Sequence, residues 1–140
     1  MHEHGPWERH SQQASHHTLI TGDTAFCYDS NAFWNEHLSR DLKVIIVDNG
    51  GGNIFRYIDG PDKNADLLPW FEAPHKRNIE RLVGSFDLPY HHAYDQASLE
   101  AGIDALYRTA ERPSVLHITT DPVTSPKVLR DYFVGLGTGS

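Results

Sequence analysis

The chain lacks several features that mark particular protein classes. It contains one cysteine, Cys27, among 140 residues, so no disulfide can form within it. A lone cysteine is typical of a small core side chain in a reducing compartment. No apolar run approaches the roughly 20 residues of a membrane span, and no signal-peptide pattern opens the chain. We therefore expect a cytoplasmic protein without a membrane partner.

Basic residues are also scarce. Lys and Arg number 12 against 19 Asp and Glu, which gives a formal net charge of −7. Nucleic-acid surfaces need clustered Lys and Arg, so we expect no nucleic-acid partner. A length of 140 residues suits one domain with a single core.

The first 17 residues, MHEHGPWERHSQQASHH, differ in composition from the rest. They have no apolar period and are rich in His, Gln and Ser, which predicts a disordered or extraneous segment. Their histidines are candidate transition-metal ligands, but the spacing matches no defined site. These histidines are His2, His4, His10, His16 and His17. We expect one domain over 18–134 and a flexible tail over 135–140.

The stretch after this segment reads as strand, helix and strand. Thr18 to Thr21 predicts a buried strand that ends at Gly22-Asp23, and the apolar run inside Lys43–Asp48 predicts a second. Ser30 to Leu38 predicts a helix capped by the Asp29-Ser30-Asn31 cluster. A helical crossover of this length implies parallel strands, so Asp23 and Asn49 should meet at one sheet edge.

Strands and helices alternate through the remaining chain. The predicted elements are helices over 76–86, 95–109 and 128–134, an extended segment over 88–94 and a buried strand over 114–119. This order predicts an α/β fold, a three-layer α/β/α sandwich with a mainly parallel sheet.

The expected edge has the donors of a metal-held anion site. Asp23 offers a carboxylate oxygen, Asn49 an amide oxygen, and the Gly50–Gly52 loop a main-chain carbonyl, which are ligands that Mg²⁺ prefers. Glycines allow a backbone to approach a bulky anion closely. N–H groups at a helix start near Ser30 would add to such a site.

Three sequence segments resemble one enzyme family. They are GDTAFCYDSNAFWN (22–35), VDNGGGNIFRYIDGP (47–61) and WFEAPH (70–75). Gly-Asp followed about 26 residues later by Asn is similar to the diphosphate motif of thiamine-diphosphate enzymes. The three segments together resemble the carboxy-terminal domain of the MenD family, the 2-succinyl-5-enolpyruvyl-6-hydroxy-3-cyclohexene-1-carboxylate synthases of menaquinone biosynthesis. The likeness covers roughly residues 18 to 134.

This resemblance implies thiamine diphosphate and Mg²⁺ or Mn²⁺ as cofactors. The implied metal ligands are the Asp23 and Asn49 side chains and the Gly51 carbonyl. The implied cofactor-binding residues are Gly22, Asp23, Thr24, Ala25, Asn49, Gly51, Gly52, Ile54 and Phe55. For Ile54-Phe55, simple anchoring of the loop is an equal alternative.

The chain departs from the family pattern at two positions beside the glycines. Asp48 stands where the family has Asn, and Asn53 where it has Gly. The extra charge of Asp48 would weaken diphosphate binding unless the side chain faces away. His75 reads as a surface histidine, with a substrate contact as the alternative.

The family reaction joins a succinyl unit from 2-oxoglutarate, after decarboxylation, to isochorismate. Its activating glutamate belongs to a pyrimidine-binding domain, normally of a neighbouring subunit in a homo-oligomer. No stretch here resembles that domain, so we expect a fragment or split subunit with no catalytic residue of its own, inactive alone.

Two alternatives stay open at this point. One is a non-catalytic remnant that still binds magnesium and a diphosphate. The other is a different thiamine-diphosphate enzyme, of the acetolactate synthase or keto-acid decarboxylase type, although the sequence NGGGNIF (49–55) argues against it. A partner gene that carries the pyrimidine domain would distinguish the enzyme from the remnant.

Overall fold

The computed structural model describes residues 16–52, 66, 68–122 and 124–137. Predictions for the first 15 residues, for Ile54 and Phe55, and for the Asn53 departure lie outside the described residues. Among the described residues, no helix has the length and apolar character needed to cross a membrane.

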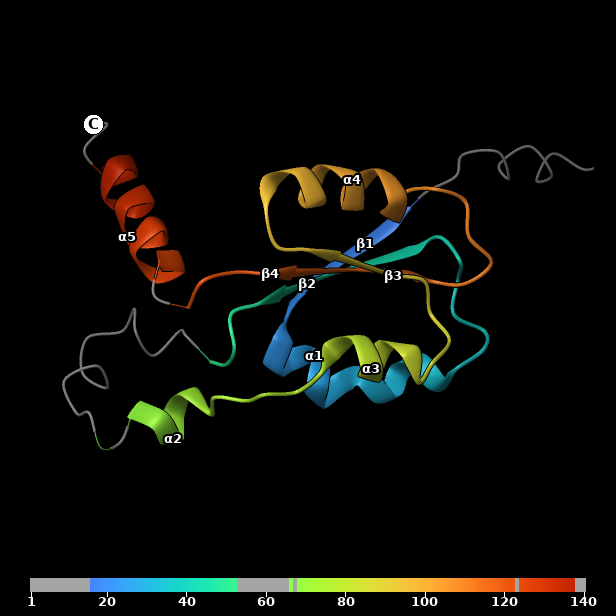
Figure 1. Cartoon of the computed structure of the whole chain (residues 1–140), viewed down its shortest axis with the longest axis horizontal. Helices are drawn as coiled ribbons and strands as arrows, with labels where there is room; N and C mark the ends of the chain where they lie inside the picture. Colours follow the sequence, from blue (N-terminus) through green and yellow to red (C-terminus); the bar gives the residue numbers. More distant parts are fainter. Residues whose placement is uncertain (1–15, 53–65, 67, 123, 138–140) are drawn as a thin grey trace, which may run out of the picture.

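The described part is built on a four-stranded parallel sheet in the order β1-β2-β4-β3. The strands are β1 (His17–Gly22), β2 (Leu42–Asp48), β3 (Tyr90–Ala93) and β4 (Ser114–Thr119). Helix α4 (Gln96–Leu106) covers one face, while α1 (Asp23–Asp29), the 3₁₀ helix η2 (Ser30–Trp34) and α3 (Ile79–Gly84) cover the other (Figure 1). This arrangement confirms the predicted three-layer α/β/α sandwich.

The two central strands form the core of the sandwich. Val44 and Ile46 of β2 and Val115 of β4 are fully buried against α1, η2 and α3. Leu116 of β4 alternates to the opposite face and packs with Leu106 of α4. The predictions of a strand covered on both faces over 43–48 and of a buried strand over 114–119 are both confirmed.

The prediction of a buried first strand is wrong. Among the described strands, β1 lies at the sheet edge and pairs only with β2. Leu19 and Ile20 point to opposite faces, yet they are 46% and 67% exposed. A short β-branched run is compatible with an edge strand as well as a central one, so the sequence pattern did not distinguish the two.

The helix predicted over 30–38 is also wrong in position. α1 starts directly at Asp23, and η2 continues it from Ser30 to Trp34. The buried anchors of this segment are Phe26 and Phe33, whose ring centroids lie 5.6 Å apart. Ser30 donates to the carbonyl of Cys27 at 3.2 Å instead of capping a helix start. Asp23 therefore follows the strand end without an intervening loop.

The later helices begin close to where the sequence places them. α4 starts after Asp95, whose side chain forms a capping box with Ser98, and Asn78 caps α3. α2 (Leu68–Glu72) is short, and α5 (Thr124–Gly137) lies beyond the end of the sheet, away from both helical layers (Figure 1). Several apolar side chains of α5 are exposed, among them Val128, Tyr132 and Phe133.

Candidate functional site

The strand register brings the polar strand ends together. Gly22 of β1 lies opposite Val47 of β2, and Asp48 lies opposite Thr119 of β4. Because all strands run parallel, the residues after these positions share the carboxyl edge of the sheet. The predicted meeting of Asp23 and Asn49 at one edge follows from this register.

Asp23 is a buried carboxylate that is only half satisfied. The residue is 2% exposed, and its Oδ1 accepts the Thr24 N–H at 2.8 Å. Its Oδ2 is buried without a hydrogen-bond donor among the described residues. Burial raises the pKa of Asp23 above its ordinary value; the Thr24 N–H opposes this, and the neighbouring Asp48 carboxyl adds to it. The Oδ2 atom lies 3.1 Å from Nε2 of His75, an ion-pair contact without hydrogen-bond geometry.

Two more buried oxygens at this edge lack a partner. They are Oδ1 of Asn49 and Oγ1 of Thr24, and neither has a hydrogen bond among the described residues. An unsatisfied buried polar group costs about 1–3 kcal/mol, and such groups need an explanation in a folded protein. Carboxylate and amide oxygens are ligands for a hard cation, and a hydroxyl can also donate to an anion.

The glycine loop beside Asn49 has a backbone that only glycine adopts easily. Gly50 and Gly51 have φ values of +80° and +150°. A Cβ on Gly51 would lie 2.7 Å from the Glu72 carbonyl oxygen. Gly52 donates to that same oxygen at 2.7 Å, and Gly50 accepts from the His75 N–H at 3.2 Å. The 72–75 segment thus holds the loop in place.

His75 is not the surface histidine that the sequence suggests. Its side chain is 14% exposed, and its Nε2 lies 3.1 Å from Oδ2 of Asp23. Nδ1 accepts the Arg77 N–H at 3.2 Å, which leaves the ring proton on Nε2. The contact with Asp23 is not aligned as a hydrogen bond, so Nε2 is a further buried polar atom without a partner among the described residues.

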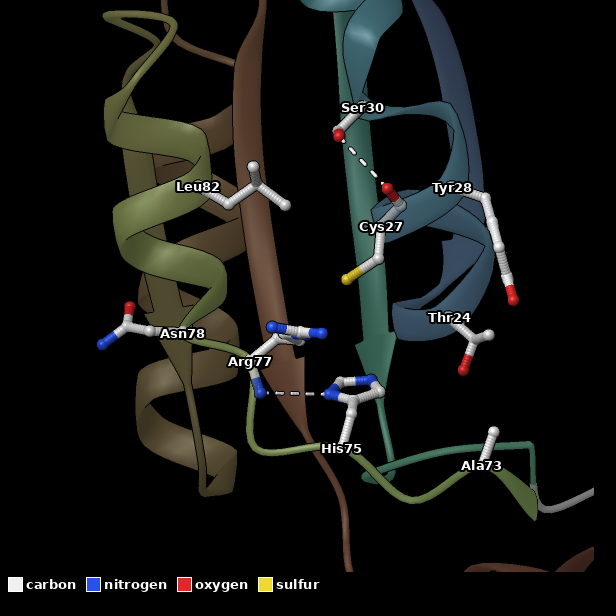
Figure 2. A pocket seen from close by; sticks show the side chains of 9 residues that line it. All are labelled: Thr24, Cys27, Tyr28, Ser30, Ala73, His75, Arg77, Asn78 and Leu82. Carbon is white, nitrogen blue, oxygen red and sulfur yellow. Dashed lines mark hydrogen bonds between the residues drawn. The ribbon is translucent and has the colours of Figure 1, made fainter. Parts of the chain in front are cut away.

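A pocket of about 500 Å³ opens beside these residues, between α1 and the chain that leads into α3 (Figure 2). Its lining includes Thr24, Cys27, His75, Arg77 and Leu82. Cys27 packs against the core, and burial followed by the charge of Asp23 raises the pKa of its thiol. This behaviour agrees with the predicted role of Cys27 as a small hydrophobic side chain.

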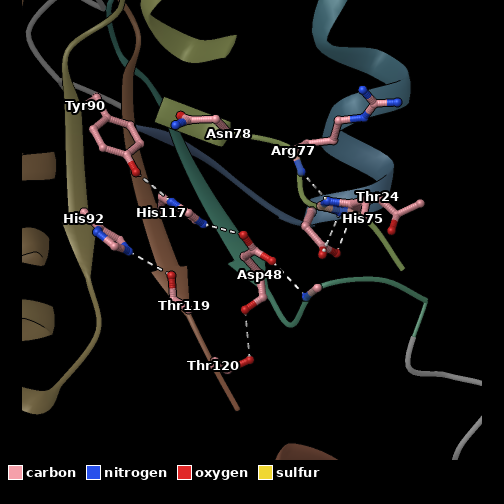
Figure 3. Close-up of polar contacts among 12 residues, drawn as sticks. Thr24, Asp48, His75, Arg77, Asn78, Tyr90, His92, His117, Thr119 and Thr120 are labelled. Carbon is pink, nitrogen blue, oxygen red and sulfur yellow. Dashed lines mark hydrogen bonds and ion pairs between the residues drawn. The ribbon is translucent and has the colours of Figure 1, made fainter. Parts of the chain in front are cut away.

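Asp48 is fully engaged by donors. Its Oδ1 accepts the Gly50 N–H at 2.9 Å, and its Oδ2 lies 2.8 Å from Nε2 of His117 (Figure 3). Burial alone would raise the pKa of Asp48, but these two bonds and the neighbouring Asp23 carboxyl hold it below the ordinary value. The extra carboxylate is therefore tied to the protein, although it lies close enough to raise the pKa of Asp23.

The remaining predicted residues lie around the same edge. Gly22 is the N-cap of α1, Ala25 is exposed on that helix, and Gly52 is half-buried.

His117 and its partner Tyr90 were not singled out from the sequence. The signal was a polar residue inside an otherwise apolar buried strand, two positions before that strand ends.

Among the described residues, no group of three or more His, Cys, Asp or Glu side chains is placed to hold a metal. The predicted donor set is of another kind, because it combines one carboxylate with an amide and a main-chain carbonyl. The buried oxygens of Asp23 and Asn49 that make no hydrogen bond among the described residues fit a hard cation.

Comparison with known proteins gives one consistent relationship. The chain is 36% identical to 2-succinyl-5-enolpyruvyl-6-hydroxy-3-cyclohexene-1-carboxylate synthase of Flavobacterium johnsoniae over 115 residues, 82% of the chain. The same synthase of Porphyromonas gingivalis is 36% identical over 82% of the chain, and that of Flavobacterium psychrophilum 34% over 84%.

The chain belongs to this synthase family. It spans about a fifth of the length of the curated relatives it matches, 21%, 20% and 21% of the three synthases. No family model matches the chain. The MenD-type domain that the three sequence segments indicate is therefore confirmed.

The close packing of the glycine loop makes a specific prediction. Gly51→Ala should lower the free energy of unfolding by about 1–3 kcal/mol, because the new Cβ meets the Glu72 carbonyl and the backbone is strained. Urea denaturation measures the change. Gly84→Ala in α3 is the matched control, since its Cβ meets nothing within 4 Å, and we expect stabilisation of up to about 1 kcal/mol. Equal effects of the two substitutions would contradict the packing argument.

Proposed function

We propose that this chain is the diphosphate- and magnesium-binding domain of a thiamine-diphosphate-dependent transferase of the synthase type. The observation that carries the proposal is a pair of buried oxygens at one sheet edge, Oδ2 of Asp23 and Oδ1 of Asn49, which make no hydrogen bond among the described residues. Asp23 and Asn49 come directly after the carboxyl ends of two parallel strands. Ligands of open α/β sheets bind at this edge.

In this proposal Asp23, Asn49 and the Gly51 carbonyl hold Mg²⁺, for which Mn²⁺ can substitute. The cation offsets the cost of the two unsatisfied oxygens and favours the ionised form of Asp23. The Thr24 hydroxyl and the Nε2–H of His75 are buried near the same point and suit the oxygens of a bound anion. A diphosphate is such an anion, and the glycine loop leaves its backbone accessible to it.

The role of the chain is to bind and orient the cofactor. When bound, thiamine diphosphate supplies the electron sink for decarboxylation of a keto acid. The proposed substrates are those of the related synthases, 2-oxoglutarate and isochorismate, in menaquinone biosynthesis. No described residue is assigned to acid–base catalysis, and the metal-binding edge acts by positioning.

The proposal includes a partner. A pyrimidine-binding domain, in the same enzyme or in a neighbouring subunit of a homo-oligomer, would supply the activating glutamate. The chain matches about a fifth of each related synthase, which leaves ample sequence in those relatives for such a domain. The carboxyl edge of the sheet, where Asp23 and Asn49 lie, is the part of the chain that this domain would face.

Removing the proposed metal ligand tests the site. Asp23→Ala should abolish Mg²⁺-dependent binding of thiamine diphosphate in a calorimetric titration. The thermal midpoint should not fall, because the substitution removes a buried carboxylate that is only half satisfied.

The matched control is Asp29→Ala, which removes an exposed carboxylate at the other end of α1. It should leave cofactor binding unchanged. If Asp23→Ala binds the cofactor as well as the wild type does, the assignment of this ligand is wrong.

The partner requirement gives a second prediction. Mixing the 140-residue chain with isochorismate, 2-oxoglutarate, thiamine diphosphate and Mg²⁺ should release no carbon dioxide above background. General acid–base help is worth about 10²–10⁴ in rate, and the chain is expected to lack it. Turnover at the rate of a complete synthase would show that a carboxylate here takes the activating role. A pyrimidine domain added in trans should raise the release above background.

A further inference from the structure

A continuous row of hydrogen bonds runs behind the glycine loop (Figure 3). The Tyr90 hydroxyl lies 2.7 Å from Nδ1 of His117, and Nε2 of His117 lies 2.8 Å from Oδ2 of Asp48. Oδ1 of Asp48 then accepts the Gly50 N–H at 2.9 Å. The row crosses the three adjacent strands β3, β4 and β2 and ends one residue after Asn49.

The direction of each bond follows from the groups involved. An ionised carboxylate only accepts, so the proton between His117 and Asp48 belongs to Nε2. In the neutral ring Nδ1 is then an acceptor, and the Tyr90 hydroxyl must donate to it. Burial lowers the pKa of His117 and raises the pKa of Tyr90 to about 12, in agreement with a neutral ring and a neutral phenol.

The row leaves Asp48 little freedom. Both carboxylate oxygens are engaged, and its main-chain carbonyl accepts the Thr120 N–H at 2.7 Å. The ring of His92 stacks on that of His117, with centroids 4.9 Å apart, while its Nε2 lies 2.8 Å from the Thr119 hydroxyl. The imidazole is thus fixed by its neighbours from two sides.

We propose that His117 and Tyr90 are positioning residues for the ligand loop. They hold the Asp48 carboxylate so that one oxygen fixes the Gly50 N–H and thereby the Asn49–Gly51 backbone. They also keep the charge of Asp48 paired within the protein instead of facing the bound anion. Only the anion-binding part of this inference rests on the proposed function.

A double-mutant cycle between His117 and Asp48 separates this role from simple packing. His117→Leu leaves a carboxylate oxygen without its donor, so exchange of the Gly50 amide hydrogen should quicken about tenfold, as expected for loss of one charge-assisted bond. In the Asp48→Asn background the same substitution should change exchange less than about threefold, because no unpaired charge is created.

The tautomer of His117 gives a readout that packing alone would not move. In the wild type, nitrogen NMR of the ring should place the proton on Nε2. In Asp48→Asn, the amide NH₂ must donate to Nε2, so the ring proton should reside on Nδ1. The Nδ1–H should then donate a hydrogen bond to the Tyr90 oxygen. A proton on Nδ1 in the wild type would overturn the proposal, and this measurement decides even if His117→Leu does not fold.

The matched control is His91→Leu on β3. His91 pairs with Leu116 in the register, so it lies on the opposite face of the sheet from His117. We expect Gly50 exchange to be unchanged in this variant. An equal acceleration by His117→Leu in the wild-type and Asp48→Asn backgrounds would mean that His117 acts only as packing, which contradicts the proposal.

Titration with Mg²⁺ and inorganic diphosphate extends the test to ligand binding. His117→Leu should weaken binding about tenfold, and the double variant His117→Leu/Asp48→Asn should recover most of it. Recovery supports the paired-charge role, and equal weakening in both backgrounds contradicts it. If the wild type binds no diphosphate, the proposed function fails, while amide exchange and ring tautomer still decide the positioning role.

Discussion

The parallel register of β1, β2 and β4 is the constraint on which the site depends. It places Gly22, Asp48 and Thr119 at one edge, so the residues that follow them converge without a long loop. Because α1 begins directly at Asp23, the carboxylate is carried into a buried position and is 2% exposed. A one-residue slip in either pair would turn these side chains to the other face.

Burial at this edge has an energetic cost that the described residues do not offset. Oδ2 of Asp23 and Oδ1 of Asn49 make no hydrogen bond among the described residues, while Asp48, whose side chain is 16% exposed, has a donor for each oxygen. The contrast is informative. The fold supplies hydrogen-bond donors to Asp48, which we do not expect to bind a ligand, but not to the two oxygens that we do. A cation with its anion is the simplest group that would satisfy the two oxygens left over.

Periodicity and turn chemistry predict much of this fold. The apolar runs of β2 and β4 and the cap at Asp95 place the central strands and α4 within a few residues. The pattern fails for β1 and α1, because a short β-branched run does not reveal its place in a sheet. Phe26 and Phe33, rather than the Asp-Ser-Asn cluster, set the helix position.

The site was predictable in part. Asp23, Asn49 and the glycines are readable because they follow strand ends and resemble a known motif. His75 and His117 are brought in from 52 and 94 positions beyond Asp23, by the loop before α3 and by β4. No local pattern reports such long-range contacts, since they depend on sheet order and register.

The central claim is that Asp23, Asn49 and Gly51 surround a cation held together with a diphosphate. Paramagnetic broadening by Mn²⁺ in the presence of thiamine diphosphate tests it most directly in the isotope-labelled chain. The account predicts that the amide signals of Thr24, Asn49 and Gly51 broaden first, while those of α4 on the other sheet face persist. Broadening confined to the amino-terminal histidines, with sharp signals at this edge, would contradict it.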